Sequence, residues 1–505
     1  MKENIGLDEK YIINPAYFIR MDNNRAILSK RGRIELSIPF EDFFTFLHPL
    51  NAQLLTFFNG KDTLGDVVNN ISNKYNLLHQ DVLDIVSEYI HNENTLNKKY
   101  KDKYLFLPKN LLIKKDEVSD YTCYNTNDFY YSSEPDLNSM RLFTPVRINL
   151  QLMMNCYTDC IYCYANRKMQ LGKLLSLKRI LSLIEEAKSI GVCDFDINGG
   201  EVLLHPNCME IISALIKNNY NPYISTKVPI SKEKIEQLKQ TGLKVMQISL
   251  DSIDRDILKK MIKVNDSYID QMKQTLFHLN KIGFRIYINT IITSYNSDTQ
   301  VLEDLVSFLS QYENVKRIRF NGVGYSIYKS AEDFLKFRTN DKFTNLMDSS
   351  FMGYIRKKYP QIELIFSPGE KECDYLEGKM DRFRKRAICT GNMRSMVILP
   401  DGKVTICEEL YNHPQFIIGD VTTHSIMEVW DSEKALNLFN IKSESISDKS
   451  VCKKCETFDI CRHYKGVCWK TILMAYGNEN WDFPDPRCPQ SPEMHNKIYA
   501  EPNMK

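Results

Sequence analysis

The sequence lacks an excess of charge of either sign. Its 505 residues include 66 Lys and Arg against 64 Asp and Glu, which gives a formal net charge of +2. A protein that grips a nucleic-acid backbone needs a strongly basic face to neutralise many phosphates. This balance removes the electrostatic case for such a function, and we expect no nucleic-acid partner.

Long apolar runs are also missing. No stretch of about 20 apolar residues occurs that could cross a membrane, and residues 1–15 are charged and lack the apolar core of a signal peptide. These absences predict a cytoplasmic protein with no membrane partner. At about 100 to 200 residues per domain, the length predicts roughly three domains.

Cysteine, in contrast, is abundant. The chain has 14 cysteines, and most of them fall in two clusters, within residues 156–163 and 389–488. Because the cytosol keeps thiols reduced, we do not expect disulfides. Clustered cysteines in such a protein indicate metal centres.

Residues 1–100 are predicted to form a small two-layer α+β domain with its own core. Extended segments precede three amphipathic helical stretches in this region. The extended segments cover residues 11–21 and 25–38, and the helices cover residues 50–58, 64–75 and 80–90. Residues 101–140 are polar and show no sustained hydrophobic periodicity, which predicts a linker that contains one or two short strands.

Residues 141–335 alternate short β-branched runs with amphipathic helical stretches. The predicted strands cover residues 146–152, 194–198, 222–227, 245–250, 285–292 and 317–323, and the helices include 175–190, 206–218, 231–241 and 267–282. Six such βα units predict an α/β fold in which a parallel sheet closes towards a partial (βα)6, TIM-like barrel. Ligands of such a fold bind at the carboxyl ends of the strands.

Residues 336–385 are predicted as a bridging region, and a helical stretch covers residues 331–359. Residues 386–505 are predicted as a separate small cysteine-rich domain built around metal. Its strands, at residues 394–399 and 403–406, flank the turn Pro400-Asp401-Gly402.

The first cysteine cluster follows the first barrel strand directly. Cys156, Cys160 and Cys163 provide three thiolates, which leave one coordination position of a metal centre open. A structural zinc site is the alternative, but zinc in such sites almost always has four protein ligands, and no fourth Cys or His is nearby. The spacing therefore indicates a catalytic metal centre.

This motif, with Tyr162 before its last cysteine, resembles the signature of the radical S-adenosylmethionine (radical SAM) enzymes. The resemblance implies that the thiolates bind three irons of a [4Fe–4S] cluster and that the fourth iron binds S-adenosylmethionine (SAM). It also implies that the reduced cluster cleaves SAM, and that the resulting 5′-deoxyadenosyl radical takes a hydrogen atom from a substrate. In such an enzyme the protein supplies orientation and excludes side reactions.

Polar residues at the ends of the predicted strands fit a SAM site. Gly199-Gly200-Glu201 resembles the GGE turn of the family, whose glycines let the backbone approach the SAM ammonium group. Val202 stands where the family commonly has proline. Further candidates for contacts with SAM share strand-end positions, although each alone could be an ordinary polar group. They are Ser225, Thr226, Lys227, Gln247, Ser249, Asp251 and Asn289.

The second cysteine cluster resembles the SPASM extension of peptide-modifying radical SAM enzymes, including the ending Asp485-Pro486-Arg487-Cys488-Pro489. The resemblance implies two auxiliary [4Fe–4S] clusters, hence three in all. It assigns Cys452, Cys455, Cys461 and Cys488 to an outer set. It assigns Cys389, Cys407 and Cys468 to an inner set, although Cys461 and Cys468 are further apart than usual. Zinc is the alternative for the four-cysteine set.

The inner set has only three obvious thiolates. Cys373 could supply a fourth ligand, and the centre would then serve electron transfer. Otherwise an open iron could bind and activate a substrate cysteine for thioether formation. Glu408, next to Cys407, could accept a proton, and an exposed strand-end carboxylate is the alternative reading.

The order of strands and helices in residues 1–100 resembles the RiPP recognition element, a PqqD-like, winged-helix-like domain. This domain binds the leaders of ribosomally synthesised and post-translationally modified peptides (RiPPs). The resemblance implies strand addition at an exposed sheet edge, with residues 80–90 as the wall of the groove. A DNA-binding helix-turn-helix is the alternative, which the charge balance disfavours.

Our leading hypothesis is a radical SAM peptide maturase that forms thioether cross-links, as in sactipeptides and ranthipeptides, with a flavodoxin- or ferredoxin-type electron donor. Within the superfamily, the alternatives are formylglycine formation of the anaerobic sulfatase-maturase type, a C–C cross-link, and epimerisation with Cys193 as hydrogen donor. Outside it, the alternative is a zinc-bearing peptide-binding module without enzymatic activity.

Overall fold

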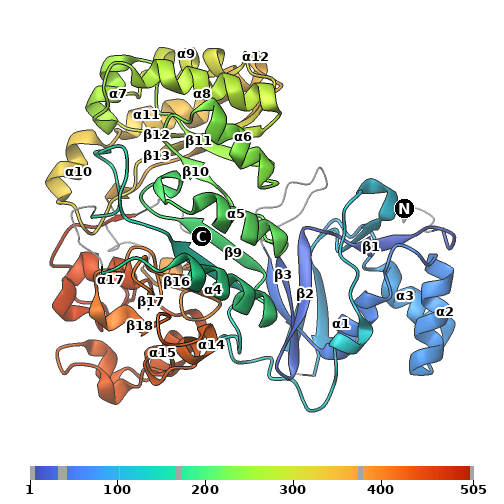
Figure 1. Ribbon diagram of the computed structural model, residues 1–505. Coiled ribbons are helices and arrows are strands. Elements are labelled where there is room, and N and C mark those ends of the chain that lie inside the picture. The colour runs from blue at the N-terminus through green and yellow to red at the C-terminus, as the bar shows by residue number, and fades with distance from the viewer. Residues whose placement is uncertain (1–5, 32–42, 102, 167–171, 373–378, 501–505) are drawn as a thin grey trace. The chain divides into compact units, whose positions relative to one another are not determined.

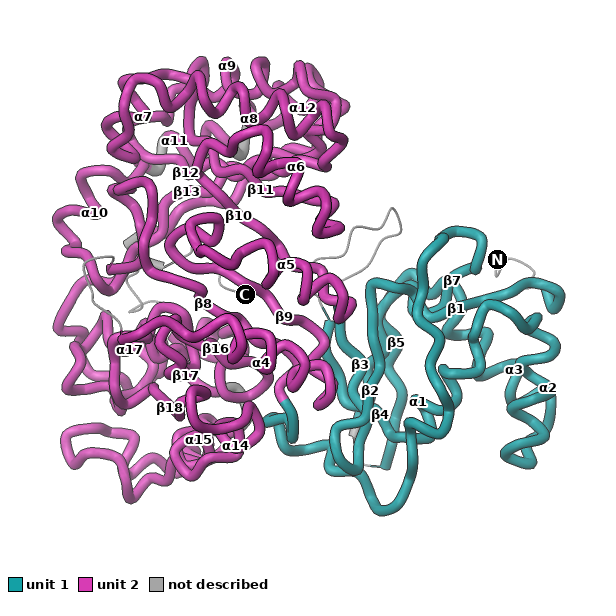
Figure 2. The backbone as a smooth tube through the Cα atoms, in the orientation of Figure 1, with its two compact units in different colours: residues 1–144 teal, residues 145–505 magenta. Residues whose placement is uncertain are grey.

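A computed structural model describes residues 6–31, 43–101, 103–166, 172–372 and 379–500. The chain divides into two compact units, Met1–Thr144 and Pro145–Lys505, which Figure 2 colours separately. Part of the predicted extended segment, residues 32–38, lies outside the described residues, and so does Cys373. Among the described residues, no helix is both long and apolar enough to span a membrane.

The first unit is built on an antiparallel sheet in the order β2-β3-β4, followed along the chain by three helices. The three helices agree with the prediction and so do β2 and β3, whereas β4 was not predicted. The strands are β2 (Tyr17–Asp22), β3 (Arg25–Lys30) and β4 (Phe44–Leu47), and the helices are α1 (Pro49–Thr56), α2 (Leu64–Tyr75) and α3 (His79–Ser87). A capping box between Thr63 and Asp66 starts α2, which buries Val67, Val68 and Ile71.

Four further strands of this unit pair antiparallel as β1 with β7 and β5 with β6. They are β1 (Tyr11–Ile13), β5 (Leu96–Tyr100), β6 (Lys103–Leu107) and β7 (Leu112–Lys114). The predicted linker thus contains strands, and its later part contacts the sheet. Buried Arg25 forms an ion pair with Asp22 at 3.1 Å, and its guanidinium donates to the carbonyls of Asp136, Ser139 and Arg141.

The second unit contains all six predicted barrel strands. They are β8 (Arg147–Gln151), β9 (Asp194–Asn198), β10 (Ser225–Thr226), β11 (Val245–Ser249), β12 (Arg285–Ile292) and β13 (Val315–Gly322). Strands β10 to β13 form a parallel sheet that continues into β14 (Glu363–Ser367), a strand the sequence analysis missed. No pairing between β9 and β10 occurs in the described residues, so a closed barrel is not confirmed. Pro222, which lacks an N–H, precedes the very short β10.

Amphipathic helices connect these strands, and polar caps begin several of them. Ser176, Ser231 and Asp254 each accept a backbone N–H at a helix start. In Figure 1, α7, α8, α9 and α12 lie on one side of β11, β12 and β13. The helices are α4 (Leu177–Ser189), α5 (Cys208–Lys217), α6 (Lys232–Gln240), α7 (Arg255–Ile262), α8 (Tyr268–Ile282), α9 (Thr299–Leu309), α10 (Ala331–Phe337), α11 (Asp341–Leu346) and α12 (Met352–Lys358).

The cysteine-rich part continues the sheet of the first two barrel strands, in the order β18-β17-β16-β8-β9. Strand β16 (Ser395–Ile398) pairs parallel with β8, and Gly402, at a φ of +89°, makes the turn to β17 (Lys403–Thr405). Both strands agree with the prediction. The remaining elements are β15 (Lys371–Glu372), α13 (Lys379–Lys385), β18 (Ile417–Asp420), α14 (Ile426–Trp430), α15 (Glu433–Phe439), α16 (Phe458–Ile460), α17 (Trp469–Tyr476) and β19 (Tyr499–Ala500).

Candidate functional site

A cavity of about 410 Å³ lies at the carboxyl ends of the parallel strands, where the predicted fold places a ligand. Cys156, Cys160 and Cys163, from the loop after β8, all line it. The Thr158 hydroxyl lies 3.2 Å from the Cys160 sulfur and 3.6 Å from the Cys156 sulfur. Among the described residues, no three Cys, His, Asp or Glu side chains are close enough to hold a single metal ion.

A buried charged network supports this loop. The Lys227 ammonium lies 2.8 Å from the Asp251 carboxylate and donates to the Tyr162 hydroxyl at 2.6 Å, and that hydroxyl also donates to Asp251. Burial lowers the pKa of Lys227, but the Asp251 carboxylate and the Cys160 thiol outweigh it and raise the pKa overall. A positive charge is therefore held beside the three thiols.

The glycine turn after β9 fits against the backbone of the cysteine loop. Gly199 has a φ of +149°, and a Cβ there would lie 2.4 Å from the Met153 carbonyl oxygen. A Cβ on Gly200 would lie 2.2 Å from the Asn155 carbonyl oxygen. The turn needs glycine because these backbone segments touch, a reason the sequence did not reveal.

The buried carboxylate of Glu201 holds the end of β10 through hydrogen bonds. It accepts hydrogen bonds from the Thr226 hydroxyl at 2.9 Å and from the Leu203 and Lys227 N–H groups. Burial raises the pKa of Glu201, although these donors oppose the shift. The predicted candidates Glu201, Thr226 and Lys227 thus form one unit that also lines the cavity.

The remaining SAM candidates divide into two groups. Ser225 and Ser249 line the cavity together with the glycine turn. Gln247 and Asn289 are absent from its wall: Gln247 donates to Ser249 at 2.8 Å, and Asn289 accepts a hydrogen bond from Asn321. The sequence placed all of these residues at strand ends, and the structure gives only some of them access to a ligand.

The other wall of the cavity carries charged groups that arrive from distant parts of the chain. Glu408 accepts a hydrogen bond from Asn198 at 3.1 Å. Lys470 lies 2.9 Å from the Glu409 carboxylate and 3.7 Å from that of Glu370. Burial lowers the pKa of Lys470, but the two carboxylates have the larger combined effect, so the pKa is raised overall. Sequence reasoning missed Lys470 and Glu370, although Lys470 is only two residues beyond Cys468.

The inner cysteine set is brought together in the structure. Burial raises the pKa of Cys407 to about 12, and Cys468 and Cys389 add to the shift because their charges are close. Burial likewise raises the pKa of Cys389 to about 11, again with Cys468 nearby. The longer spacing before Cys468 is taken up by a π-helical turn, Cys461–Lys465, and by Gly466 with a φ of +64°.

The four cysteines of the outer set line a second cavity, of about 270 Å³. Two arginines donate to the thiols of this set: Arg386 to Cys461 and Arg462 to Cys452, each at 3.4 Å. The two remaining cysteines, Cys455 and Cys488, share the cavity wall. Four thiols around one cavity, with cationic donors to sulfur, fit an anionic iron–sulfur cluster.

The first cavity also fits the groups that its motif implies. Three thiols could hold a [4Fe–4S] cluster, and the cradle of Gly199, Gly200 and Ser225 leaves room for SAM beside them. Cys193 precedes β9 at its amino end, opposite the end where the cavity opens, and does not line it. The structure therefore contradicts Cys193 as a hydrogen donor, because its strand separates it from the site.

Comparisons with known proteins agree with this geometry. Residues 150–309 match the Radical SAM superfamily, and residues 389–456 match SPASM, described as an iron-sulfur cluster-binding domain. Curated relatives include GTP 3′,8-cyclase from Aquifex aeolicus, 23% identical over 46% of this chain and 74% of the relative. The same enzyme from Staphylococcus haemolyticus is 24% identical over 61% of this chain and 92% of the relative.

Among solved structures, Streptococcus suis SuiB superposes with a TM-score of 0.59 at 16% identity, over 94% of this chain and 99% of that chain. SuiB bound to precursor peptide SuiA gives a TM-score of 0.56 at 15% identity, over 95% of this chain and 100% of that chain. At this identity the likeness establishes the fold. Residues 150–309 and 389–456 thus form a Radical SAM domain and a SPASM domain, and these two matches support a radical SAM oxidoreductase that uses [4Fe–4S] clusters and SAM.

Proposed function

We propose that the protein modifies a ribosomally synthesised precursor peptide. The observation that carries this proposal is the cavity, which is lined both by three thiols of the loop after β8 and by charged side chains of the SPASM region. The similar fold of SuiB, solved with precursor peptide SuiA, supports a peptide substrate. When bound, the cluster and SAM supply the radical that removes a hydrogen atom from the substrate.

The residues of the chain orient the reactants and move a proton. Lys227 and Asp251 hold Tyr162 and the cysteine loop in place, and Glu201 fixes the end of β10. Glu408 lines the same cavity as the three thiols and would accept the proton that leaves the substrate. Gly199, Gly200, Ser225 and Ser249 would contact SAM.

Within this class we favour thioether cross-linking from a substrate cysteine. The inner set offers three thiols in the described part of the chain, and the charged pair of Glu409 and Lys470, each next to that set in sequence, lines the cavity. A cluster with an open iron there would bind a substrate thiolate. If Cys373 completes the set instead, the inner cluster would serve electron transfer and formylglycine formation would gain support.

The first unit would bind the leader of the precursor. In the described residues, β4 pairs with β3 on one side and has no strand partner on the other. Helix α3 and the residue that caps its start add exposed apolar side chains: Ile85 on the helix, with 37% of its surface accessible, and the N-cap residue Leu78, with 72%. An extended leader would pair with a free strand edge of this unit, and α3 would offer apolar side chains to it. A flavodoxin- or ferredoxin-type protein would supply electrons.

The test is to incubate the anaerobically reconstituted enzyme with SAM, reductant and candidate precursors that contain cysteine. The expected product is lighter than the precursor by two hydrogen atoms and appears together with 5′-deoxyadenosine. Protein with Cys156, Cys160 and Cys163 replaced by alanine is the control and should form neither. Unchanged peptide mass across all candidates would refute the proposal, and bound zinc without iron would favour a non-enzymatic peptide-binding module.

A further inference from the structure

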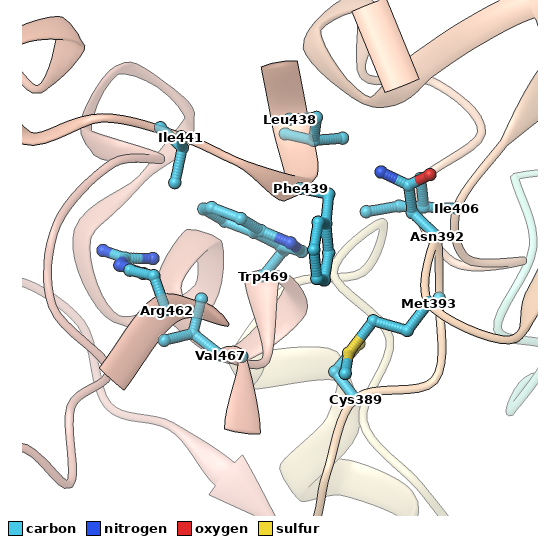
Figure 3. A pocket seen from close by; sticks show the side chains of 12 residues that line it. Cys389, Asn392, Met393, Ile406, Leu438, Phe439, Ile441, Arg462, Val467 and Trp469 are labelled. Atoms are coloured by element: carbon cyan, nitrogen blue, oxygen red, sulfur yellow. The ribbon is translucent and has the colours of Figure 1, made fainter. Parts of the chain in front are cut away.

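Arg462 occupies a position between the two auxiliary cysteine sets. It lines the 270 Å³ cavity of the outer set, and it also lines a smaller cavity, of about 30 Å³, that Cys389 of the inner set shares. Figure 3 shows Arg462, Trp469 and Cys389 around the smaller cavity. Val467 is the other residue whose side chain lines both. The one thiol that its guanidinium contacts in the described residues is Cys452, of the outer set.

The contacts of this side chain leave part of it unsatisfied. Only 5% of Arg462 is exposed. Its Nη2 donates to the Cys452 sulfur at 3.4 Å and to the carbonyls of Asp482 and Phe483 at 3.2 and 3.1 Å. The guanidinium carbon lies 5.2 Å from the centre of the Trp469 ring. Nη1, in contrast, is buried without a hydrogen-bond partner among the described residues.

A buried, unpartnered N–H of a cation calls for an anionic acceptor. Four thiols surround the adjoining cavity, and a [4Fe–4S] cluster bound by them would carry negative charge on its sulfurs. Nη1 would then find the acceptor that the polypeptide does not provide. Cations and hydrogen bonds to sulfur favour the reduced, more negative form of such a cluster, and so raise its reduction potential.

We propose that Arg462 raises the reduction potential of the outer cluster and makes it the electron-accepting end of the auxiliary pair. The inference rests on the proposed function, in which the substrate loses two hydrogen atoms, one as an atom and one as a proton and an electron. The outer cluster takes up that single electron through the inner centre, and no bond is made or broken at Arg462. Arg462 is therefore a positioning residue, not a catalytic one.

Redox titration followed by electron paramagnetic resonance tests this role without turnover. The full chain is used with Cys156, Cys160 and Cys163 replaced by alanine, so that only auxiliary clusters contribute, and with a chemical reductant in place of substrate. We expect Arg462→Gln to move one auxiliary midpoint to a more negative potential at unchanged iron content. The matched control is Arg356→Gln, which removes an arginine that donates to the Leu364 carbonyl and to no thiol. It should leave both midpoints in place.

Arg462→Lys provides a second variant in case Arg462→Gln does not retain the outer cluster. Lysine keeps the positive charge but loses the paired N–H donors of the planar guanidinium. We therefore expect a smaller shift of the midpoint potential, again to a more negative value. An unchanged midpoint in the glutamine variant, or in the lysine variant if only that one assembles, overturns the role of Arg462. Zinc in place of iron in the outer set overturns it as well. Failure of the parent enzyme to cleave SAM would instead count against the proposed function.

Discussion

At the scale of single residues, the ion pair of Lys227 and Asp251 shows how buried charge can support the first cysteine loop. The Asp251 side chain has no exposed surface, and that of Lys227 is 13% exposed. The second carboxylate oxygen of Asp251 accepts the Ile291 N–H at 2.9 Å. Removing either partner would leave an uncompensated buried charge, which costs far more than the loss of an exposed pair.

We therefore expect Asp251→Asn to lower the free energy of unfolding of the iron-free protein by about 3–5 kcal/mol. Denaturant unfolding would measure this change. Asp270→Asn is the matched control, because its 2.7 Å pair with Arg255 has both side chains more than half exposed. If the two variants lost equal stability, the buried pair would have no special role.

Gly200 gives a second prediction at this scale. A methyl group there would collide with the Asn155 carbonyl, and overpacking of this kind costs about 1–3 kcal/mol. Gly200→Ala should therefore destabilise the protein and reduce the iron bound by the first cysteine loop. Gly353→Ala serves as the control, because nothing lies within 4 Å of its added methyl group. Normal iron content in Gly200→Ala protein would contradict this account.

At the scale of elements, helix α3 presents apolar side chains that its own unit does not bury. We expect the double variant Leu78→Glu/Ile85→Glu to weaken binding of a fluorescently labelled precursor at least tenfold, because it places charge in the expected groove. SAM cleavage without peptide should stay unchanged. Phe277→Glu changes a side chain with 51% of its surface exposed on α8, in the other unit, and should not affect binding.

The elements also show what sequence patterns can predict. The six strands and their helices were predictable because β-branched runs and amphipathic periods are local signals. The pairing of β16 with β8 was not, because nearly 250 residues separate these strands and pairing depends on shape and register. Lys470 and Glu370 were missed for the same reason: each reaches the cavity from a segment far away in sequence from the first cysteine loop. Local spacing did locate Cys156, Cys160 and Cys163.

At the scale of the whole molecule, the first unit and a shortened form of the second unit, residues 145–385, should differ in their ability to fold alone. Residues 1–144 have their own core and should give a cooperative thermal transition when expressed as a fragment. Residues 145–385 would lose β16, so one edge of β8 would be unpaired beside the first cysteine loop. We expect that fragment to be insoluble or molten. Circular dichroism in the near and far ultraviolet would decide both outcomes.

The shared sheet also links the first cysteine loop to Cys407 of the inner set. Strand β8 leads into the loop of Cys156 and pairs with β16, which in turn pairs with β17, the strand that leads to Cys407, so one set of backbone ladders holds both thiol loops. Heating or chaotrope that separates β8 from β16 would release these thiols together. Loss of brown colour during denaturation should then occur as one steep step shared by the radical centre and the inner auxiliary centre, and chelators should strip neither site selectively before that step.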